Sequence, residues 1–143
     1  MSTEQNKSIA RRFSEAFDSN DQAIFNELLA PDLVAHVPGA PGPLNREAFL
    51  QLGNMFIVAF SDSHITLEDQ IAEGDKVVSR YTWRVVHTGA FQGLPPTSKQ
   101  LAVTGIDIAR IKDGKIVEYW ANQDQMGMMQ QLGVIPAPEQ AAA

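Results

Sequence analysis

Acidic, amide and aromatic side chains occur together in one short stretch of this chain, residues 105–124. The stretch reads as two strands joined by Asp113-Gly114, a dipeptide typical of a type I′ hairpin turn, and this turn places Asp107 opposite Trp120. One face of the hairpin then carries Asp107, Ala109, Ile111, Ile116, Glu118, Trp120, Asn122 and Asp124. An apolar surface with a few polar groups is typical of a ligand pocket. A carboxylate whose pKa is raised there by burial could exchange protons with the ligand.

The register of the hairpin decides which side chains share a face, and a slip of one residue would exchange the two faces. In the register above, the opposite face is apolar and consists of Ile106, Ile108, Val117, Tyr119 and Ala121. Such a patch is larger than a monomer usually exposes. We therefore predict a homodimer that packs sheet to sheet and buries about 1,200–2,000 Å² in total.

Both aspartates of this candidate site have alternative roles. Asp124 lies between the second strand and a helix predicted for residues 125–132, so it could instead serve as the N-cap of that helix. Asp107 could instead form an ion pair with Arg80 or Arg110.

Histidines are the remaining candidates for chemistry. His36 lies on a short strand, residues 33–37, and His87 ends a strand predicted for residues 76–87. For each histidine, a hydrogen-bonded structural role is the alternative to a catalytic one. No spacing typical of a metal site links them to the aspartates, so no metal is predicted. Arg80 shares a strand with His87, and alternation along this strand leaves open which face lines the pocket.

Helical spacing dominates the first part of the chain. Ile9, Phe13, Ala16 and Phe17 recur on one side of a predicted first helix. A short second helix ends before Pro31, and Asn45 is a suitable N-cap for a third helix.

From Ile65 onward the apolar spacing becomes alternating, which is typical of strands. Helices followed by hairpin-linked strands favour an α+β fold, with the helices gathered on one side of a curved antiparallel sheet. The sheet and helices together form a cone whose interior is the predicted pocket. A single domain is predicted over residues 1–136, with a disordered tail over residues 137–143.

Composition narrows the classes of partner and location. The 143 residues include 17 acidic and 11 basic side chains, a net charge of −6, which argues against binding nucleic acid or an anionic membrane. No cysteine is present, so disulfides and thiolate zinc sites are excluded. Neither an N-terminal apolar run typical of a signal peptide nor a stretch of about 20 apolar residues occurs. A cytoplasmic protein is predicted.

The order of the predicted elements and two sequence segments resemble the SnoaL-like polyketide cyclase family, within the NTF2-like (cystatin-like cone) superfold. The first segment is His87-Thr-Gly-Ala-Phe-Gln-Gly-Leu-Pro-Pro-Thr-Ser-Lys99. The second begins at Gly105, contains Tyr119-Trp120 and Asp124, and ends with Gln131-Leu-Gly133. The resemblance extends from the first helix to Gly133.

This resemblance implies a cofactor-independent aldol cyclisation of a polyketide ester or a similar small apolar carbonyl compound. It assigns the general acid/base role to Asp124, places Asp107 where some members carry a histidine, and places His36 at the mouth of the pocket. Asp124 is expected to be the most buried carboxylate of this set. The side chains expected to bind substrate are Trp120, Asn122, His87 and Arg80, with Asn122 holding the enolate or carbonyl oxygen.

Two other function classes remain open, because one fold can host many activities. The first is a protein that binds a small molecule in the same cone without turnover. The second is an enzyme of the ketosteroid isomerase or epoxide hydrolase type. Epoxide opening would use an Asp–Arg–Asp set, for which Asp107, Asp124 and either Arg80 or Arg110 are available.

Overall fold

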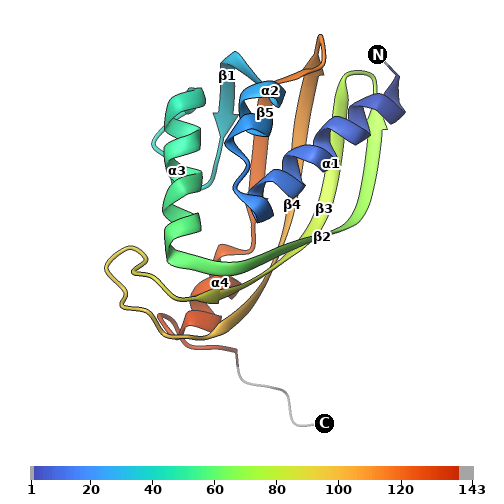
Figure 1. The fold of residues 1–143 in the computed structure, drawn as a ribbon. Helices are drawn as coiled ribbons and strands as arrows, with labels where there is room; N and C mark the ends of the chain where they lie inside the picture. The colour runs from blue at the N-terminus through green and yellow to red at the C-terminus, as the bar shows by residue number, and fades with distance from the viewer. Residues whose placement is uncertain (1, 139–143) are drawn as a thin grey trace, which may run out of the picture.

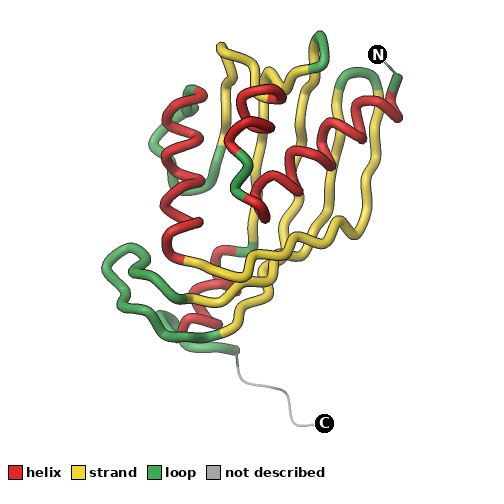
Figure 2. Tube along the Cα trace, viewed as in Figure 1, coloured by secondary structure: helices red, strands yellow, loops and turns green. Residues whose placement is uncertain are grey.

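Helices cover one face of a bent sheet in the computed structural model, which describes residues 2–138 (Figure 1). Within these residues, the covering helices are α1 (Thr3–Ser19), α2 (Gln22–Leu28) and α3 (Arg46–Ala59) (Figure 2). The strands are β1 (Leu29–His36), β2 (Phe60–Glu73), β3 (Lys76–His87), β4 (Gln100–Lys112) and β5 (Lys115–Gln123). A last helix, α4 (Gln125–Leu132), packs at one end of the sheet. The predicted α+β architecture is confirmed.

Polar side chains begin the N-terminal helices. Ser2 and Gln5 form a reciprocal capping box at the start of α1, and Asp21 caps α2. Asn45 caps α3 as predicted, because its side-chain oxygen accepts the backbone N–H of Ala48 at 2.9 Å. These caps place the start of each helix where its apolar side can pack on the sheet.

The strand order in the sheet is β1-β5-β4-β3-β2. The pairs from β2 to β5 are antiparallel, as predicted, whereas β1 pairs with β5 in parallel. The parallel pair follows from chain order, because the whole segment from α3 to β4 separates the two strands. Such a long connection allows either strand direction.

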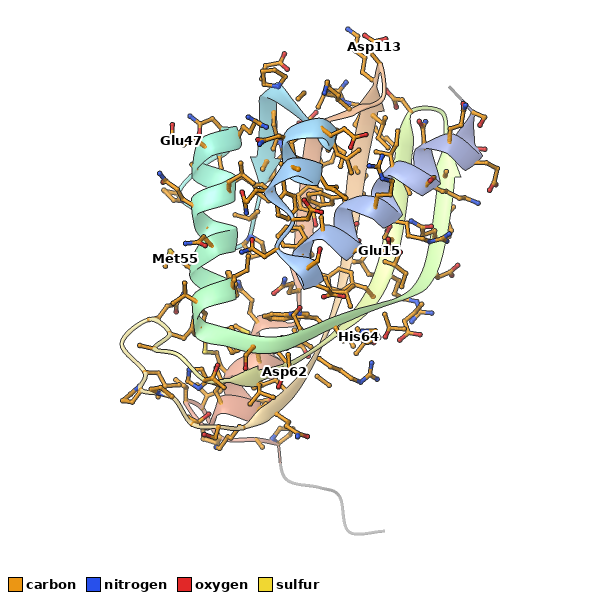
Figure 3. All side chains as sticks on the ribbon, viewed as in Figure 1. Glu15, Glu47, Met55, Asp62, His64 and Asp113 are labelled. Atoms are coloured by element: carbon orange, nitrogen blue, oxygen red, sulfur yellow. The ribbon has the colours of Figure 1, made fainter. Side chains whose placement is uncertain are left out.

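The hairpin between β4 and β5 has the predicted turn. Asp113 and Gly114 both have positive φ, 52° and 76°, as a type I′ turn requires. Figure 3 shows Asp113 at the tip of this hairpin, at the end of the sheet opposite α4. Next to the turn, Ile111 pairs with Ile116 as the turn predicts.

A β-bulge then changes the register. Arg110 pairs with Glu118, so Val117 is the extra residue on β5. Asp107 consequently pairs with Ala121, and the predicted pairing with Trp120 is wrong. Because side chains alternate along a strand, one extra residue moves every later β5 side chain to the opposite face.

Aromatic side chains join the helix layer to the sheet. The ring of Phe13 on α1 lies 5.0–6.2 Å, between centroids, from the rings of Phe17, Phe25, Phe49 and Tyr119. A second apolar cluster lies at the α4 end of the sheet and includes Phe60, Trp83, Phe91, Leu101, Met128 and Leu132. A cavity lies between these two clusters.

The end of the predicted domain at residue 136 stays a prediction. Of the predicted tail, residues 139–143 lie outside the described residues. Within residues 2–138, no helix is long and apolar enough to cross a membrane.

Candidate active site

A cavity of about 340 Å³ lies between the helices and the covered face of the sheet. Its walls are mostly apolar and include five phenylalanine rings and one tryptophan ring: Phe13, Phe17, Phe49, Phe56, Phe60 and Trp83. They come from α1, α3, β2 and β3. A cavity of this size and character can bury most of a small organic molecule.

Asp107 is the single buried carboxylate among residues 2–138, with 7% of its surface exposed, and it lines this cavity. The hydroxyl of Tyr119 donates a hydrogen bond to its Oδ2 at 2.8 Å. Burial raises the pKa of Asp107 to about 6, because the charged form loses its hydration, and the Tyr119 bond opposes that rise. The carboxylate can therefore both accept and return a proton near neutral pH.

Small neighbours leave space around this carboxylate. Asp107 is flanked in the sheet by Ser79 of β3 and Ala121 of β5. The predicted alternative of an ion pair is wrong, because Arg110 instead lies 3.2 Å from Glu118 on the opposite face of the sheet and Arg80 is exposed.

Two further polar side chains line the cavity beside Asp107. Tyr81 pairs with Gly105, and Gly105 pairs with Gln123, so the three form one row across the sheet. Burial, helped by the nearby charge of Asp107, raises the pKa of Tyr81 to about 12. Tyr81 is therefore a neutral phenol at physiological pH.

The charged residues that line the cavity are acidic: Asp18, Asp62 and Asp107, with no lysine or arginine among the described lining residues. Asp18 has a structural role, because it accepts hydrogen bonds from the Ser63 hydroxyl at 2.8 Å and from the backbone N–H of Ile65 at 2.9 Å. These bonds tie the start of β2 to the end of α1.

Asp124 does not line the cavity, contrary to the prediction that it would be the most buried carboxylate. It is exposed and caps α4, since its Oδ1 accepts the backbone N–H of Gly127 at 2.9 Å. The alternative N-cap role is therefore confirmed. A Cβ at position 127 would overlap the present position of the Asp124 carboxylate, so glycine suits this cap.

The other β5 side chains predicted for the pocket lie on the opposite face of the sheet. Trp120 and Asn122 are placed there by the Val117 bulge, and they line a shallow depression with His36. His36 stacks on Trp120 at 5.4 Å between centroids, and its Nε2 lies 2.8 Å from Glu118. The predicted convergence of these residues with Asp107 in one cavity is wrong.

His87 is buried beside the cavity and does not line it. Its Nδ1 accepts the backbone N–H of Thr97 at 3.1 Å. Its ring packs at 5.3 Å from that of Phe60. This geometry matches the alternative structural role, in which His87 holds the loop 88–99 against the sheet.

Sequence reasoning missed Tyr81, Tyr119 and Gln123. One signal was available for the first of these: a glycine inside a strand often marks the close approach of another group, and Gly105 lies directly opposite Tyr81. No comparable signal marked Tyr119 or Gln123, because the bulge at Val117 decides their face.

A mostly apolar cavity with one buried carboxylate, enclosed by an α+β cone, defines a small-molecule site suited to proton transfer. The comparisons with known proteins agree with this class. The chain belongs to the SnoaL-like polyketide cyclase family, which it matches over residues 7–132. The predicted family and class of function are thereby confirmed.

Individual relatives support the same family. The chain is 30% identical over 138 residues to aklanonic acid methyl ester cyclase DauD of Streptomyces sp. (strain C5), covering 92% of this chain and 84% of the relative. It is similar to the crystal structure of IdmH, a candidate polyketide cyclase from Streptomyces antibioticus, with TM-score 0.83, 34% identity and coverage of 90% and 99%. AclR, a candidate hydroxylase from Streptomyces galilaeus, shares the fold at TM-score 0.88 and 24% identity, covering 96% and 87%.

Proposed function

We propose that this chain catalyses the intramolecular aldol cyclisation of a polyketide ester, with Asp107 as general acid and base. The observation that supports it best is the position of Asp107, the one buried carboxylate of the described chain, in the wall of an apolar cavity. The two curated relatives, DauD and DnrD, are both named aklanonic acid methyl ester cyclases, which supports an ester as substrate.

The proposed reaction needs one group that moves one proton. The Asp107 carboxylate removes a proton from a carbon next to a carbonyl, and the resulting enolate carbon attacks a second carbonyl of the same molecule. A C–C bond forms while the second C=O becomes an alkoxide. That alkoxide takes the proton back from Asp107, which leaves the enzyme unchanged. A carboxyl group with a pKa of about 6 suits both steps.

Tyr119 would orient this carboxylate. Its hydroxyl donates to Oδ2 of Asp107, which leaves Oδ1 to meet the substrate proton. Tyr119 packs against Phe13 and Phe49, so its ring has little freedom to turn. A general base in a partly dry site contributes most to the reaction rate when its orientation is fixed before the substrate binds.

The charge of the cavity favours a neutral substrate. A free carboxylate would enter a site lined by Asp18, Asp62 and Asp107 without a lining cation among the described residues. A second negative charge near Asp107 would raise its pKa further and leave less of this carboxyl group ionised at the start of the reaction. We therefore expect the methyl ester to react and the matching free acid to react much more slowly.

The test compares two aspartates. Asp107→Asn keeps the size of the side chain and removes the proton acceptor, so we expect turnover of a polyketide methyl ester to fall ~10²-fold or more, with an unchanged fold by circular dichroism. Asp124→Asn keeps a capping oxygen and should retain turnover within about threefold. The catalytic role that the resemblance implied for Asp124 is tested by the same pair. Full activity in Asp107→Asn would reject our assignment, and a parent enzyme inactive on all such esters would favour a binding protein.

We also propose that the chain forms a homodimer through the face of the sheet opposite the cavity. The predicted patch needs correction, because Tyr119 and Ala121 line the cavity. In the observed register a row of apolar side chains crosses four strands on the outer face: Ile71, Val78, Ile108 and Trp120. Ile71 is 62% exposed and Ile106, in the neighbouring row, is 50% exposed. A monomeric mass by light scattering at micromolar concentration would reject the dimer. The cytoplasmic location stays a prediction.

A further inference from the structure

The ring of Tyr81 crosses the sheet over a glycine. Tyr81 on β3 pairs with Gly105 on β4, which pairs with Gln123 on β5. A Cβ at position 105 would overlap both Cζ and the hydroxyl oxygen of Tyr81. Because position 105 has no side chain, the phenol can lie over the β4 backbone and reach the part of the cavity wall beside β5.

Gln123 and Asp107 are polar neighbours of the Tyr81 side chain on the cavity face. Gln123 lies on the far side of Gly105 in the same row across the sheet. An amide that donates to the phenol oxygen from this side would leave the phenol hydrogen for another acceptor. Asp107 lies two residues beyond Gly105 on the same face of β4, a separation of roughly 7 Å along the strand. All three polar side chains line the cavity.

From this arrangement we propose that the Tyr81 hydroxyl binds the carbonyl oxygen of the substrate while Asp107 removes the proton from the adjacent carbon. Gln123 is the positioning residue that orients the hydroxyl. The inference rests on the proposed function of Asp107. As the C–H bond breaks, the electron pair moves to the carbonyl oxygen, and a neutral phenol can stabilise that developing charge in a dry site. The oxyanion role predicted for Asn122 is thereby assigned to Tyr81, because Asn122 lies on the outer face.

The first test is Tyr81→Phe, which removes one oxygen atom, with Tyr119→Phe as the matched control. Loss of one oxyanion donor lowers kcat by ~10²–10³-fold, and we expect KM to change little. The pH midpoint of kcat/KM should stay in place in Tyr81→Phe. Tyr119→Phe should instead move that midpoint upward, because the Tyr119 bond lowers the pKa of Asp107. Tyr81→Phe with parental kcat, alongside an inactive Asp107→Asn, would reject the role of Tyr81 and leave the proposed function standing.

A second test measures oxyanion binding without turnover. 4-Nitrophenol is used as the probe, and its absorbance reports its ionisation. In the Asp107→Asn background, which mimics the enzyme after it has taken the proton, the bound probe should ionise more readily than in water. Adding Tyr81→Phe should weaken binding of the phenolate about tenfold or more. Equal phenolate binding with and without Tyr81→Phe would overturn the inference, whether or not a turnover substrate is found.

Gly105→Ala tests whether the absence of a side chain at position 105 is needed to place the Tyr81 ring. The new methyl group must displace the phenol, so we expect kcat to fall by an amount similar to that in Tyr81→Phe. Two groups that act through one hydroxyl are not additive, so the double variant should be no slower than the slower single variant. Gln123→Leu should weaken phenolate binding in the same assay and leave the melting temperature within a few degrees. Additive losses in the Gly105→Ala, Tyr81→Phe double variant would show that Gly105 does not act through Tyr81. Unaltered phenolate binding in Gln123→Leu would show that Gln123 does not orient the hydroxyl.

Discussion

Two carboxylates on one hairpin, Asp107 and Glu118, have opposite electrostatic surroundings. Asp107 lies on the cavity face, where burial raises its pKa to about 6. Glu118 lies on the outer face, where hydrogen bonds from His36 and then Arg110 lower its pKa. Their pKa values are shifted in opposite directions because they lie on opposite faces of the sheet, and the difference between Asp and Glu matters far less. Of the two, only the buried carboxylate has a pKa that is raised toward neutral pH.

The largest effect should come from removing the aromatic ring that joins the covered face of β5 to the helices. Tyr119→Ala removes a buried side chain that packs against Phe13 and Phe49. Loss of a buried aromatic side chain costs ~3–5 kcal/mol, so we expect thermal unfolding at a much lower temperature and no turnover. Asn122→Ala, at an exposed position on the outer face of the same strand, is the control and should cost far less. A Tyr119→Ala variant that melts like the parent would show that Tyr119 does not hold the sheet against the helices.

The next effect concerns the stability of Asp107→Asn. Burial raises the pKa of this group from its ordinary 3.8 to about 6, a difference that corresponds to about 3 kcal/mol against folding at neutral pH. In the folded state the group binds its proton more tightly, so stability falls as pH rises from about 4 to 6 and is level above. Asp107→Asn should therefore melt higher than the parent at pH 7 and similarly at pH 4, by calorimetry. A variant that is less stable at pH 7 would contradict this.

The pH dependence of activity should follow the same group. The base must be ionised, so kcat/KM for the ester should fall about tenfold per pH unit below a midpoint near 6 and level off above it. Initial rates between pH 4.5 and 8 check this. The profile of the Glu118→Gln variant should have the same midpoint. A midpoint near 4, as for an exposed aspartate, would contradict the buried environment of the base.

The smallest effect is expected on the outer face. Glu118→Gln removes the bonds with His36 and Arg110, yet partly exposed ion pairs contribute little. Turnover should stay within about twofold of the parent, and the melting temperature should fall slightly at pH 7. That small loss should vanish as pH falls through the lowered pKa of Glu118, because protonation removes the pair in the parent as well. A large loss of turnover would mean that the outer face takes part in the reaction.

Much of the fold could be predicted because local patterns decide it. Helical spacing around Phe13, the cap at Asn45 and the Asp113-Gly114 turn each depend on residues close in sequence, and each has the predicted form. The site could be predicted only in part. Asp107 was a candidate and lines the cavity, whereas Trp120 was a candidate and does not.

The sequence by itself determined the elements, the hairpin turn and the family, since these follow from short-range propensities and from a pattern that spans residues 7–132. Only the tertiary structure decided which side chains meet in the cavity. This arrangement depends on Val117, because one extra residue in β5 turns Tyr119 toward Asp107 and Trp120 away from it. No local propensity marks such a bulge, because it is stabilised by the packing of Tyr119 against helices that are far away in the sequence.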